Sequence, residues 1–314
     1  MQSGRNDARD TLIGVGLVLL ASIGFSARGV IIKLAYPYGV DAVTLLALRM
    51  LFSLPFFALM ALVAQRGAAP LSRPQWHMVI VLGFIGYYLS SFLSFLALAY
   101  IAAALERLLL YLTPTIVIII SALLMKQPIR RHHIAALALT YGGILLVMSD
   151  QMLAATDSLA VLTGSTLAFV SALTYAVYLV ASGSIIPTIG AARFTAYASG
   201  TACGFVILQF LIVRDLHALD LPLPVYGYGA IMAMFCTVLP LWMMAEGIRR
   251  IGANQSSLLS SIGPVATIVL AAILLDEPVS LVQTCGAALV LGGVWLVGMK
   301  REAAASAPGQ PSAR

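Results

Sequence analysis

Long apolar stretches without Asp, Glu, Lys or Arg dominate the sequence. Because a bilayer core about 30 Å thick takes about 20 helical residues to cross, most of these stretches are long enough to span a membrane. The second one reaches that length when Arg49 is included in a span of about 41–65. Transmembrane strands would instead alternate apolar and polar residues over about ten positions. The pattern therefore predicts ten transmembrane helices. The uncharged stretches are residues 11–27, 50–65, 74–105, 108–125, 132–149, 158–192, 194–213, 221–245, 251–275 and 278–299.

The composition favours the same fold class. Hydrophobic residues make up 61% of the 314 residues and charged residues only 10%, whereas a soluble domain carries about a quarter charged residues. A surface covered by lipid accounts for the deficit, so we expect an all-α integral membrane protein. We attribute the net charge of +6 to membrane topology, and we expect no nucleic-acid partner.

The basic residues predict the orientation. If both termini are cytoplasmic, thirteen of the eighteen Lys and Arg residues lie on the cytoplasmic side, and only Lys33, Arg107 and Arg214 lie outside. Because basic segments next to spans are retained in the cytoplasm, the expected topology is N-in, C-in. Residues 1–10 then form a cytoplasmic N-terminus, and residues 301–314 form a disordered cytoplasmic tail.

The two halves of the chain repeat each other. Residues 101–150 match residues 251–300 at a constant offset of 150, with fifteen identities in fifty positions. The matches include Pro114 with Pro264 and the pair Gly142-Gly143 with Gly292-Gly293. We therefore divide the chain into repeats 11–150 and 151–300. Because each half has five helices, the second must be inverted in the membrane, which is typical of secondary transporters with a site near the midplane.

A known family carries the same pattern. Residues 248–297, IRRIGANQSSLLSSIGPVATIVLAAILLDEPVSLVQTCGAALVLGGVWLV, resemble the EamA family of ten-helix carriers in the drug/metabolite transporter superfamily. The first-repeat counterpart is similar, with Lys126-Gln127 in place of Asp276-Glu277. The resemblance implies secondary transport of small metabolites across the bacterial inner membrane, often export of amino acids or toxic compounds. It does not imply a particular substrate.

Charged residues inside the spans are candidate site residues. Arg49 lies within the second span, where a charge is costly unless it faces a cavity or a partner. It is a candidate for binding a substrate carboxylate or phosphate, and the alternative is an ion pair with Glu106 or Asp41. Glu106 is a candidate for coupling transport to protons, and the alternative is an interfacial ion pair. Arg28 and Lys33 are expected to extend their charged groups to the interface.

Polar aromatic residues near the span centres complete the predicted substrate site. Because midspan hydroxyl groups need partners, we expect several of them to line a cavity, with core packing as the alternative. Pro114 and Pro264 each remove a backbone donor and predict helix kinks that serve gating. The predicted substrate-binding residues besides Arg49 are Tyr87, Tyr88, Tyr111, Tyr175, Tyr178, Trp242 and Ser260. Glu246 is expected to pair with Arg249 and Arg250 on one helical face.

No motif for a metal, nucleotide or other cofactor is evident. The sequence lacks GxxxxGK[ST] and HExxH, and the adjacent His132 and His133 cannot bind one metal from one helical face. Transport would then draw on ion or substrate gradients rather than on nucleotide hydrolysis.

The sequence therefore predicts a transporter working by alternating access, with export of amino acids or similar amphipathic metabolites as the first interpretation. Its partners would be a small-molecule substrate, protons and the lipid bilayer, and it would be a monomer or a weak homodimer. Uptake of a vitamin or nucleotide-like solute is the alternative. A membrane-embedded enzyme is a more remote alternative, because the sequence has no cluster of acid, His or nucleophile at one membrane depth. A passive channel would differ from a transporter by ungated flux that does not saturate.

Overall fold

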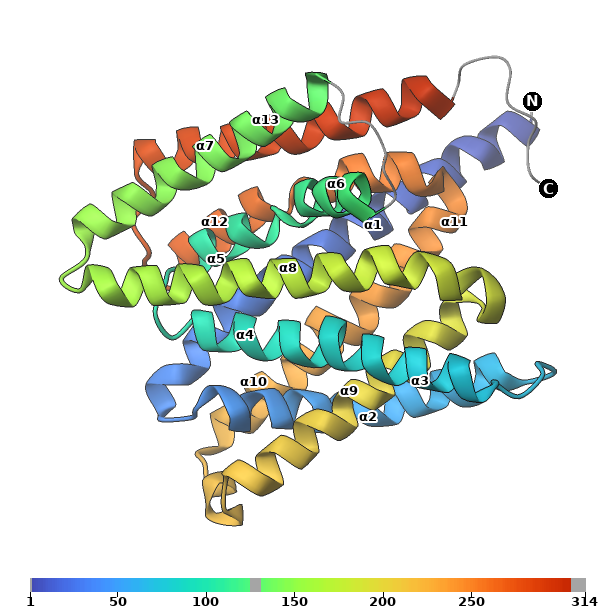
Figure 1. Cartoon of the computed structure of the whole chain (residues 1–314), viewed down its shortest axis with the longest axis horizontal. Coiled ribbons are helices and arrows are strands. Elements are labelled where there is room, and N and C mark those ends of the chain that lie inside the picture. The colour runs from blue at the N-terminus through green and yellow to red at the C-terminus, as the bar shows by residue number, and fades with distance from the viewer. Residues whose placement is uncertain (1, 125–130, 306–314) are drawn as a thin grey trace.

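A computed structural model describes residues 2–124 and 131–305 of the chain. Lys126, Gln127 and Arg130 lie outside these residues, as do residues 306–314 of the predicted tail. Within the described ranges the secondary structure is helical, and they contain no strand (Figure 1). The α-helices are α1 (Gln2–Ala35), α2 (Ala42–Gln65), α3 (Arg73–Leu82), α4 (Ser90–Ala97), α5 (Ala103–Leu110), α6 (Thr113–Leu124), α7 (Arg131–Ala154), α8 (Ser158–Ile189), α9 (Ala191–Val213), α10 (Leu223–Ala233), α11 (Leu239–Ser260), α12 (Gly263–Leu274) and α13 (Leu281–Ala305).

Short irregular helical turns link some of these helices. η1 (Tyr36–Tyr38) and η3 (Leu216–Leu219) are 3₁₀ turns, whereas η2 (Gly83–Leu89) and η4 (Met234–Val238) are wider π-helical turns. The π-helical turns join α3 to α4 and α10 to α11 without a loop.

Eight helical segments among the described residues are long and apolar enough to cross a membrane. Two further apolar stretches stand where the sequence predicts the ninth and tenth spans: Gly263–Leu274, which is too short for a full span, and Leu281–Leu296, which forms the first part of α13. The twelve residues of α12 rise only ~18 Å, because the chain breaks just before Gly263. The ten-helix count therefore remains a prediction.

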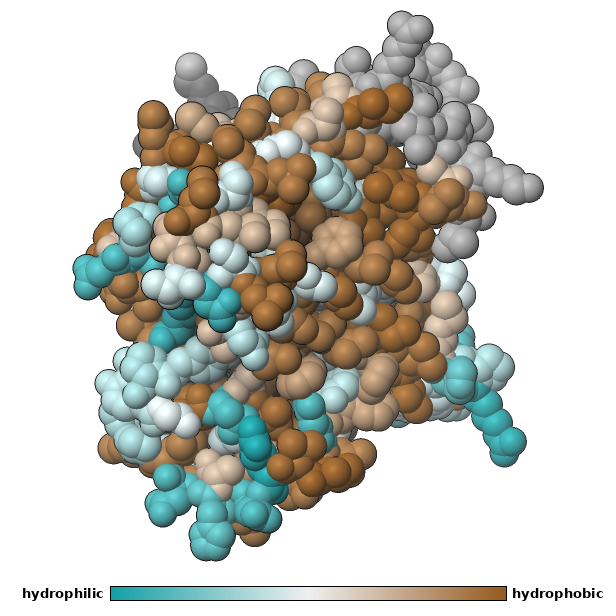
Figure 2. Space-filling view, turned by 60° about the vertical axis from the view of Figure 1, so that its left-hand side comes forward, coloured by the Kyte–Doolittle hydropathy of each residue, from teal (hydrophilic) through white to brown (hydrophobic). Residues whose placement is uncertain are grey.

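The surface of the bundle is apolar. Large side chains such as Leu12, Leu62, Leu145 and Leu153 are more than half exposed. Figure 2 shows hydrophobic residues covering most of one face, with hydrophilic residues gathered towards its lower edges. Such a surface is stable in lipid rather than in water. The protein is therefore a multi-pass membrane protein.

The two repeats break their helices at equivalent positions. The chain turns at residues 111–112 between α5 and α6, and again at residues 261–262 before α12, which is the predicted offset of 150. Pro114 and Pro264 stand in the first turns of the half-helices that follow. There the missing N–H costs no hydrogen bond, so both prolines start a helix rather than kink the interior of one. The π-helical turns η2 and η4 also correspond at this offset.

Helices α7 and α13 pack through two equivalent contacts, one at a glycine of each repeat. A Cβ on Gly143 would lie 2.5 Å from the Gly286 carbonyl, and one on Gly293 would lie 2.8 Å from the Ala136 carbonyl. At the offset of 150, Gly293 corresponds to Gly143 and Ala136 to Gly286, so each contact is the counterpart of the other. From Ala136 to Gly143 along α7, the contacted residue of α13 changes from Gly293 back to Gly286. The two helices therefore run antiparallel (Figure 1).

The first helix of each repeat packs on the other repeat in the same reciprocal way. Gly14 of α1 faces Ile251, and Gly164 of α8 faces Ile101, again at matching positions. Helix α1 accordingly packs on α11 and α12, and α8 packs on α4, α5 and α6. Each repeat therefore completes its core with the opening helix of the other.

The ends of the helices gather at two ends of the bundle. We call the end that holds the start of α1 and the last turns of α13 the terminal end, and the other the opposite end (Figure 1). At the terminal end Arg250 pairs with Asp10 at 3.0 Å, and Arg193 donates to the Ala69 carbonyl at 2.7 Å. At the opposite end Arg214 pairs with Asp41 at 3.2 Å.

Candidate functional site

Four charged side chains come together inside the bundle, one to two helical turns from its opposite end. Arg28 comes from α1, Arg49 from α2, and Glu106 and Arg107 from α5, and we call these four residues the charged cluster. Arg28 Nη2 lies 4.0 Å from Glu106 Oε1, and the Ser94 hydroxyl donates to the same oxygen. Glu106 is only 2% exposed. A buried carboxylate requires such partners, because burial disfavours an unpaired charge.

Arg49 is buried but has no acidic partner among the described residues. Its side chain donates from Nε to Thr237 Oγ1 of η4 at 3.1 Å, and its guanidinium carbon lies 5.6 Å from the centre of the Phe95 ring. Arg49 Nη1 has no hydrogen-bond partner in the described part of the chain. The alternative of an ion pair with Glu106 or Asp41 does not hold here, because these carboxylates are paired with Arg28 and Arg214.

Arg107 and Tyr111 connect the charged cluster to the break before α12. Arg107 Nη2 donates to Ser26 Oγ at 3.2 Å, and its guanidinium carbon lies 5.4 Å from the Tyr111 ring centre. The Tyr111 hydroxyl donates to the Ser260 carbonyl at 2.8 Å. Gly263 leaves room for this contact, since a Cβ there would collide with the Tyr111 hydroxyl. Both break points therefore meet across the repeat interface.

Three of the predicted tyrosines form one aromatic group deeper in the bundle. The Tyr178 ring centre lies 5.2 Å from that of Tyr87, 5.5 Å from that of Tyr175 and 5.8 Å from that of Phe194. Gly86 lies directly against the Tyr178 side chain, so no larger residue fits there. Tyr87, Tyr175 and Tyr178, which we call the tyrosine group, thus bring η2 and α8 together.

The remaining predicted aromatic residues lie elsewhere. Tyr88 packs with Phe84 and Phe205, with ring centres 5.0 and 5.9 Å away. Trp242 is 60% exposed on the bundle surface, as expected for an aromatic residue that faces lipid, and it takes no part in the tyrosine group. The Ser260 hydroxyl donates to the Ser256 carbonyl at 2.7 Å, so its backbone rather than its hydroxyl joins Tyr111.

Lys33 and Arg28 differ from the sequence expectation. Both were expected to extend their charged groups to the interface. Instead, Arg28 belongs to the charged cluster, and Lys33 Nζ lies 3.0 Å from Glu277 Oε1. The same Glu277 oxygen accepts the Ala103 backbone N–H at the start of α5 at 3.1 Å. An acid is favoured at a helix N-terminus, so Glu277 links three segments of the opposite end.

Sequence reasoning also missed the polar partners of the charged cluster. Ser26, Ser94 and Thr237 contact its members, yet single hydroxyl residues in apolar spans carry little signal. The usable signal for Thr237 was positional: it stands at the offset of 150 from the candidate Tyr87. The pairing of Glu246 with Arg249 at 2.6 Å and with Arg250 at 2.8 Å, by contrast, was predicted from spacing and is confirmed.

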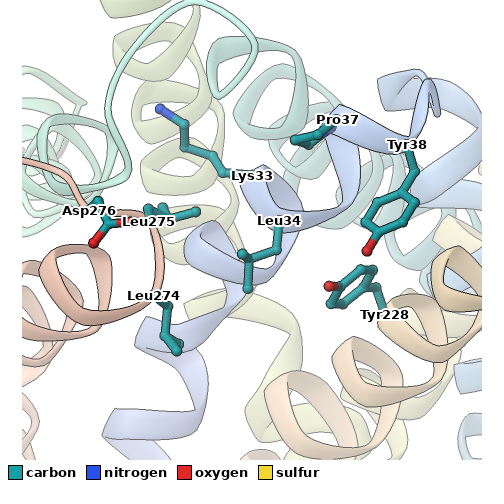
Figure 3. Close-up of a pocket in the computed structure, with 8 residues that line it drawn as sticks. All are labelled: Lys33, Leu34, Pro37, Tyr38, Tyr228, Leu274, Leu275 and Asp276. Atoms are coloured by element: carbon teal, nitrogen blue, oxygen red, sulfur yellow. The ribbon is translucent and has the colours of Figure 1, made fainter.

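A pocket of about 440 Å³ opens beside the Lys33–Glu277 contact (Figure 3). Its walls come from α1 with the following turn, from α10 and from the link after α12, and the Tyr38 and Tyr228 hydroxyls face each other across it. The lining residues are Lys33, Leu34, Pro37, Tyr38, Tyr228, Leu274, Leu275 and Asp276. Among the described residues, no three His, Cys, Asp or Glu side chains gather closely enough to hold a metal ion.

Known proteins share this sequence pattern and fold. The "Uncharacterized transporter YcbK" of Bacillus subtilis is 29% identical over 296 residues, covering 92% of each chain. The "Uncharacterized transporter YyaM" of the same organism is 26% identical over 216 residues, covering 68% of this chain and 70% of the relative. A protein of known crystal structure has the same fold, with a TM-score of 0.62 and 19% identity over 95% of this chain and 99% of that chain.

The family comparison covers both repeats. The model of the EamA-like transporter family matches residues 12–149 and again residues 162–299. The two matches begin and end 150 residues apart, which is the offset of the helix breaks and of the exchanged glycine contacts. This chain therefore belongs to the EamA-like transporter family.

Proposed function

We propose that the protein is a secondary active transporter that moves small amphipathic metabolites across the bacterial inner membrane by alternating access. In this proposal ten helices cross the membrane as two inverted five-helix repeats, with both termini in the cytoplasm. The terminal end of the bundle is then cytoplasmic and the opposite end faces outwards. Export of amino acids or similar metabolites is the first direction to test.

One observation carries the proposal: a buried group of charges and tyrosines lies where helices of both repeats meet. Arg49 contacts Thr237 and Tyr111 contacts the Ser260 carbonyl, and both contacts cross between the repeats, whereas Arg107 contacts Ser26 within the first repeat. Charges inside a membrane bundle are expensive, so they mark substrate or ion pathways. The location between repeats is the position at which inverted-repeat transporters bind substrate.

The broken helices give the proposed site its means of opening. Tyr111 follows the short helix α5, Ser260 ends the part of α11 that follows its non-helical turn at Gly252, and Pro114 and Pro264 stand in the first turns of the next helices. Small rotations about these breaks would separate Tyr111 from Ser260 without unfolding a helix. The Lys33–Glu277 ion pair joins α1 to the link after α12 at the opposite end, and we infer that it helps to close this end and breaks in the outward-facing state. Glu106 is the candidate group for proton coupling.

The test is an untargeted comparison of metabolites inside and outside bacteria that overproduce the protein. Wild-type cells should lose one class of solute and their medium should gain it, and Arg49→Ala should abolish both changes. Arg193→Ala is the matched control, because Arg193 is also buried but lies at the terminal end and donates to the Ala69 carbonyl. Accumulation of a solute inside the cells would reverse the direction to uptake. If the metabolite profile does not change with the wild-type protein, the transport proposal fails.

A further inference from the structure

The charged cluster is not electrically balanced. Within the described part of the chain its three arginines face one carboxylate, Glu106, so the cluster has one negative charge for three positive ones. The acids nearest to it are already engaged, because Glu277 pairs with Lys33 at 3.0 Å and Asp41 pairs with Arg214 at 3.2 Å. A buried excess of positive charge is unfavourable unless an anion compensates it.

Two guanidinium nitrogens of the cluster have unused hydrogen-bonding capacity. Arg49 Nη1 and Arg107 Nε are both buried and have no partner among the described atoms. Buried polar nitrogens are normally satisfied. The planar guanidinium fork is suited to carboxylate and phosphate, since two N–H groups can donate to two oxygens. The unused N–H donors and the excess positive charge therefore both favour the binding of an oxyanion.

The second repeat has no charges at the corresponding positions. At the offset of 150, Arg28 corresponds to Tyr178, Arg49 to Ser199 and Glu106 to Ser256. Tyr178 belongs to the tyrosine group, and another member of this group, Tyr175, interacts electrostatically with Arg28. The region between the repeats thus has one charged half and one half of aromatic rings and hydroxyl groups.

We propose that the charged cluster binds the oxyanion of an amphipathic organic anion, whose apolar body packs against the tyrosine group. This inference rests on the proposed transport function and narrows its substrates to molecules of net negative charge. Arg49 and Arg107 supply the unused donors. The distance between Arg28 Nη2 and Glu106 Oε1 is long for an ion pair, at 4.0 Å. The incoming oxyanion therefore competes with Glu106 for this arginine.

The test measures ligand binding to the purified full-length protein through the shift in its melting temperature. Phenylacetate and phenylphosphate are the two oxyanion probes, and phenylacetamide is the neutral isostere. We expect at least one oxyanion to bind about tenfold or more tightly than the amide, because hydrogen bonds to charged groups are the stronger ones. The better oxyanion identifies carboxylate or phosphate as the preferred group.

The variants separate binding from folding. Arg49→Gln should weaken oxyanion binding about tenfold or more, Arg49→Lys should weaken it less, and Arg193→Gln should leave it unchanged. Glu106→Gln keeps a side chain that can bond Ser94 but removes the competing charge, so it should tighten oxyanion binding. Looser binding in Glu106→Gln would mean that Glu106 only supports the structure of the site.

Three outcomes would overturn the anion site: equal affinity for phenylacetamide, unchanged binding in Arg49→Gln, or no binding of either oxyanion. Flux of the same probes through proteoliposomes distinguishes this failure from failure of the transport function. Binding of an oxyanion without any flux would keep the site and remove transport. Saturable flux of uncharged solutes without oxyanion binding would keep transport and remove the anion site.

Discussion

At the scale of single residues, several acids near the helix ends have close basic partners, whereas Arg49 inside the bundle has no acidic partner among the described residues. Near the helix ends, Glu246, Asp41 and Glu277 each have a basic partner within 3.2 Å. One to two turns inside the opposite end, Arg49 has only a neutral hydroxyl and an aromatic ring. The Asp41 and Glu277 pairs join different segments of the chain, whereas Arg49, without an acidic partner among the described residues, leaves capacity for a ligand.

Asp41 gives a residue-scale prediction about pH. Partial burial disfavours its ionised form, but hydrogen bonds from Thr44 and Arg214 outweigh this effect, so the pKa of the Asp41 carboxyl lies below its usual range. It also caps α2 by accepting the backbone N–H groups of Val43 and Thr44 at 2.9 and 3.2 Å. A carboxyl with a lowered pKa stabilises the fold above its unfolded pKa and stops doing so as pH falls through the folded pKa.

Asp41→Ala should therefore lower the free energy of unfolding by about 1 kcal/mol at neutral pH, the usual cost of a lost N-cap. Asp41→Asn should keep most of the capping but should remove the part of the loss of stability at acidic pH that comes from protonation of Asp41. Melting temperatures of the purified variants between neutral and acidic pH measure both effects. Asp215→Ala is the control, since Asp215 precedes a helical turn without a capping bond from its side chain. An equal effect of both alanine variants would contradict the capping role.

At the scale of helices, the paired glycines have unequal roles. Nothing lies within 4 Å of a Cβ placed on Gly142 or Gly292, whereas one on Gly143 or Gly293 would collide with the neighbouring helix. Glycines in membrane helices commonly allow neighbouring helices to approach closely. The structure assigns that role only to the second, because neighbouring residues on a helix point about 100° apart.

Gly143→Ala should destabilise the protein by about 1–3 kcal/mol, the usual cost of an overpacked interface. Gly142→Ala should leave it unchanged or slightly more stable, because alanine is the better helix former. Gly293→Ala and Gly292→Ala provide the same comparison in the second repeat. Thermal melting in detergent measures the four variants, and similar melting temperatures within each pair would show that α7 and α13 do not pack as described.

Local patterns explain which helical features the sequence could predict. Apolar runs, the offset of 150 and the prolines are visible without a structure, and they led to the spans, the repeats and approximate positions of the breaks. The π-helical turns η2 and η4 have no comparable local signal. The partners of Arg49 could not be predicted either, because Thr237 lies 188 residues away in the chain and helix packing alone brings the two together.

At the scale of the whole molecule, the two ends of the bundle predict a topology that labelling can test. Tyr38 is exposed at the opposite end and Ala69 at the terminal end. Cys203 and Cys236 are buried, so replacing the exposed Cys285 by alanine provides a suitable background. In intact cells, a membrane-impermeant maleimide should label Tyr38→Cys and should label Ala69→Cys only after permeabilisation. The reverse result would overturn the N-in, C-in orientation.

The reciprocal packing of Gly14 on Ile251 and of Gly164 on Ile101 means that neither half is a complete folding unit. A free five-helix half would leave the surface that receives the partner's first helix exposed. A second identical chain inserted in the opposite direction would cover this surface with its first helix, and the first helix of the original chain would cover the same surface of the second. In such a homodimer the equivalent positions of the two chains would have to hold the same residue, whereas the single chain holds Arg28 at one of them and Tyr178 at the other.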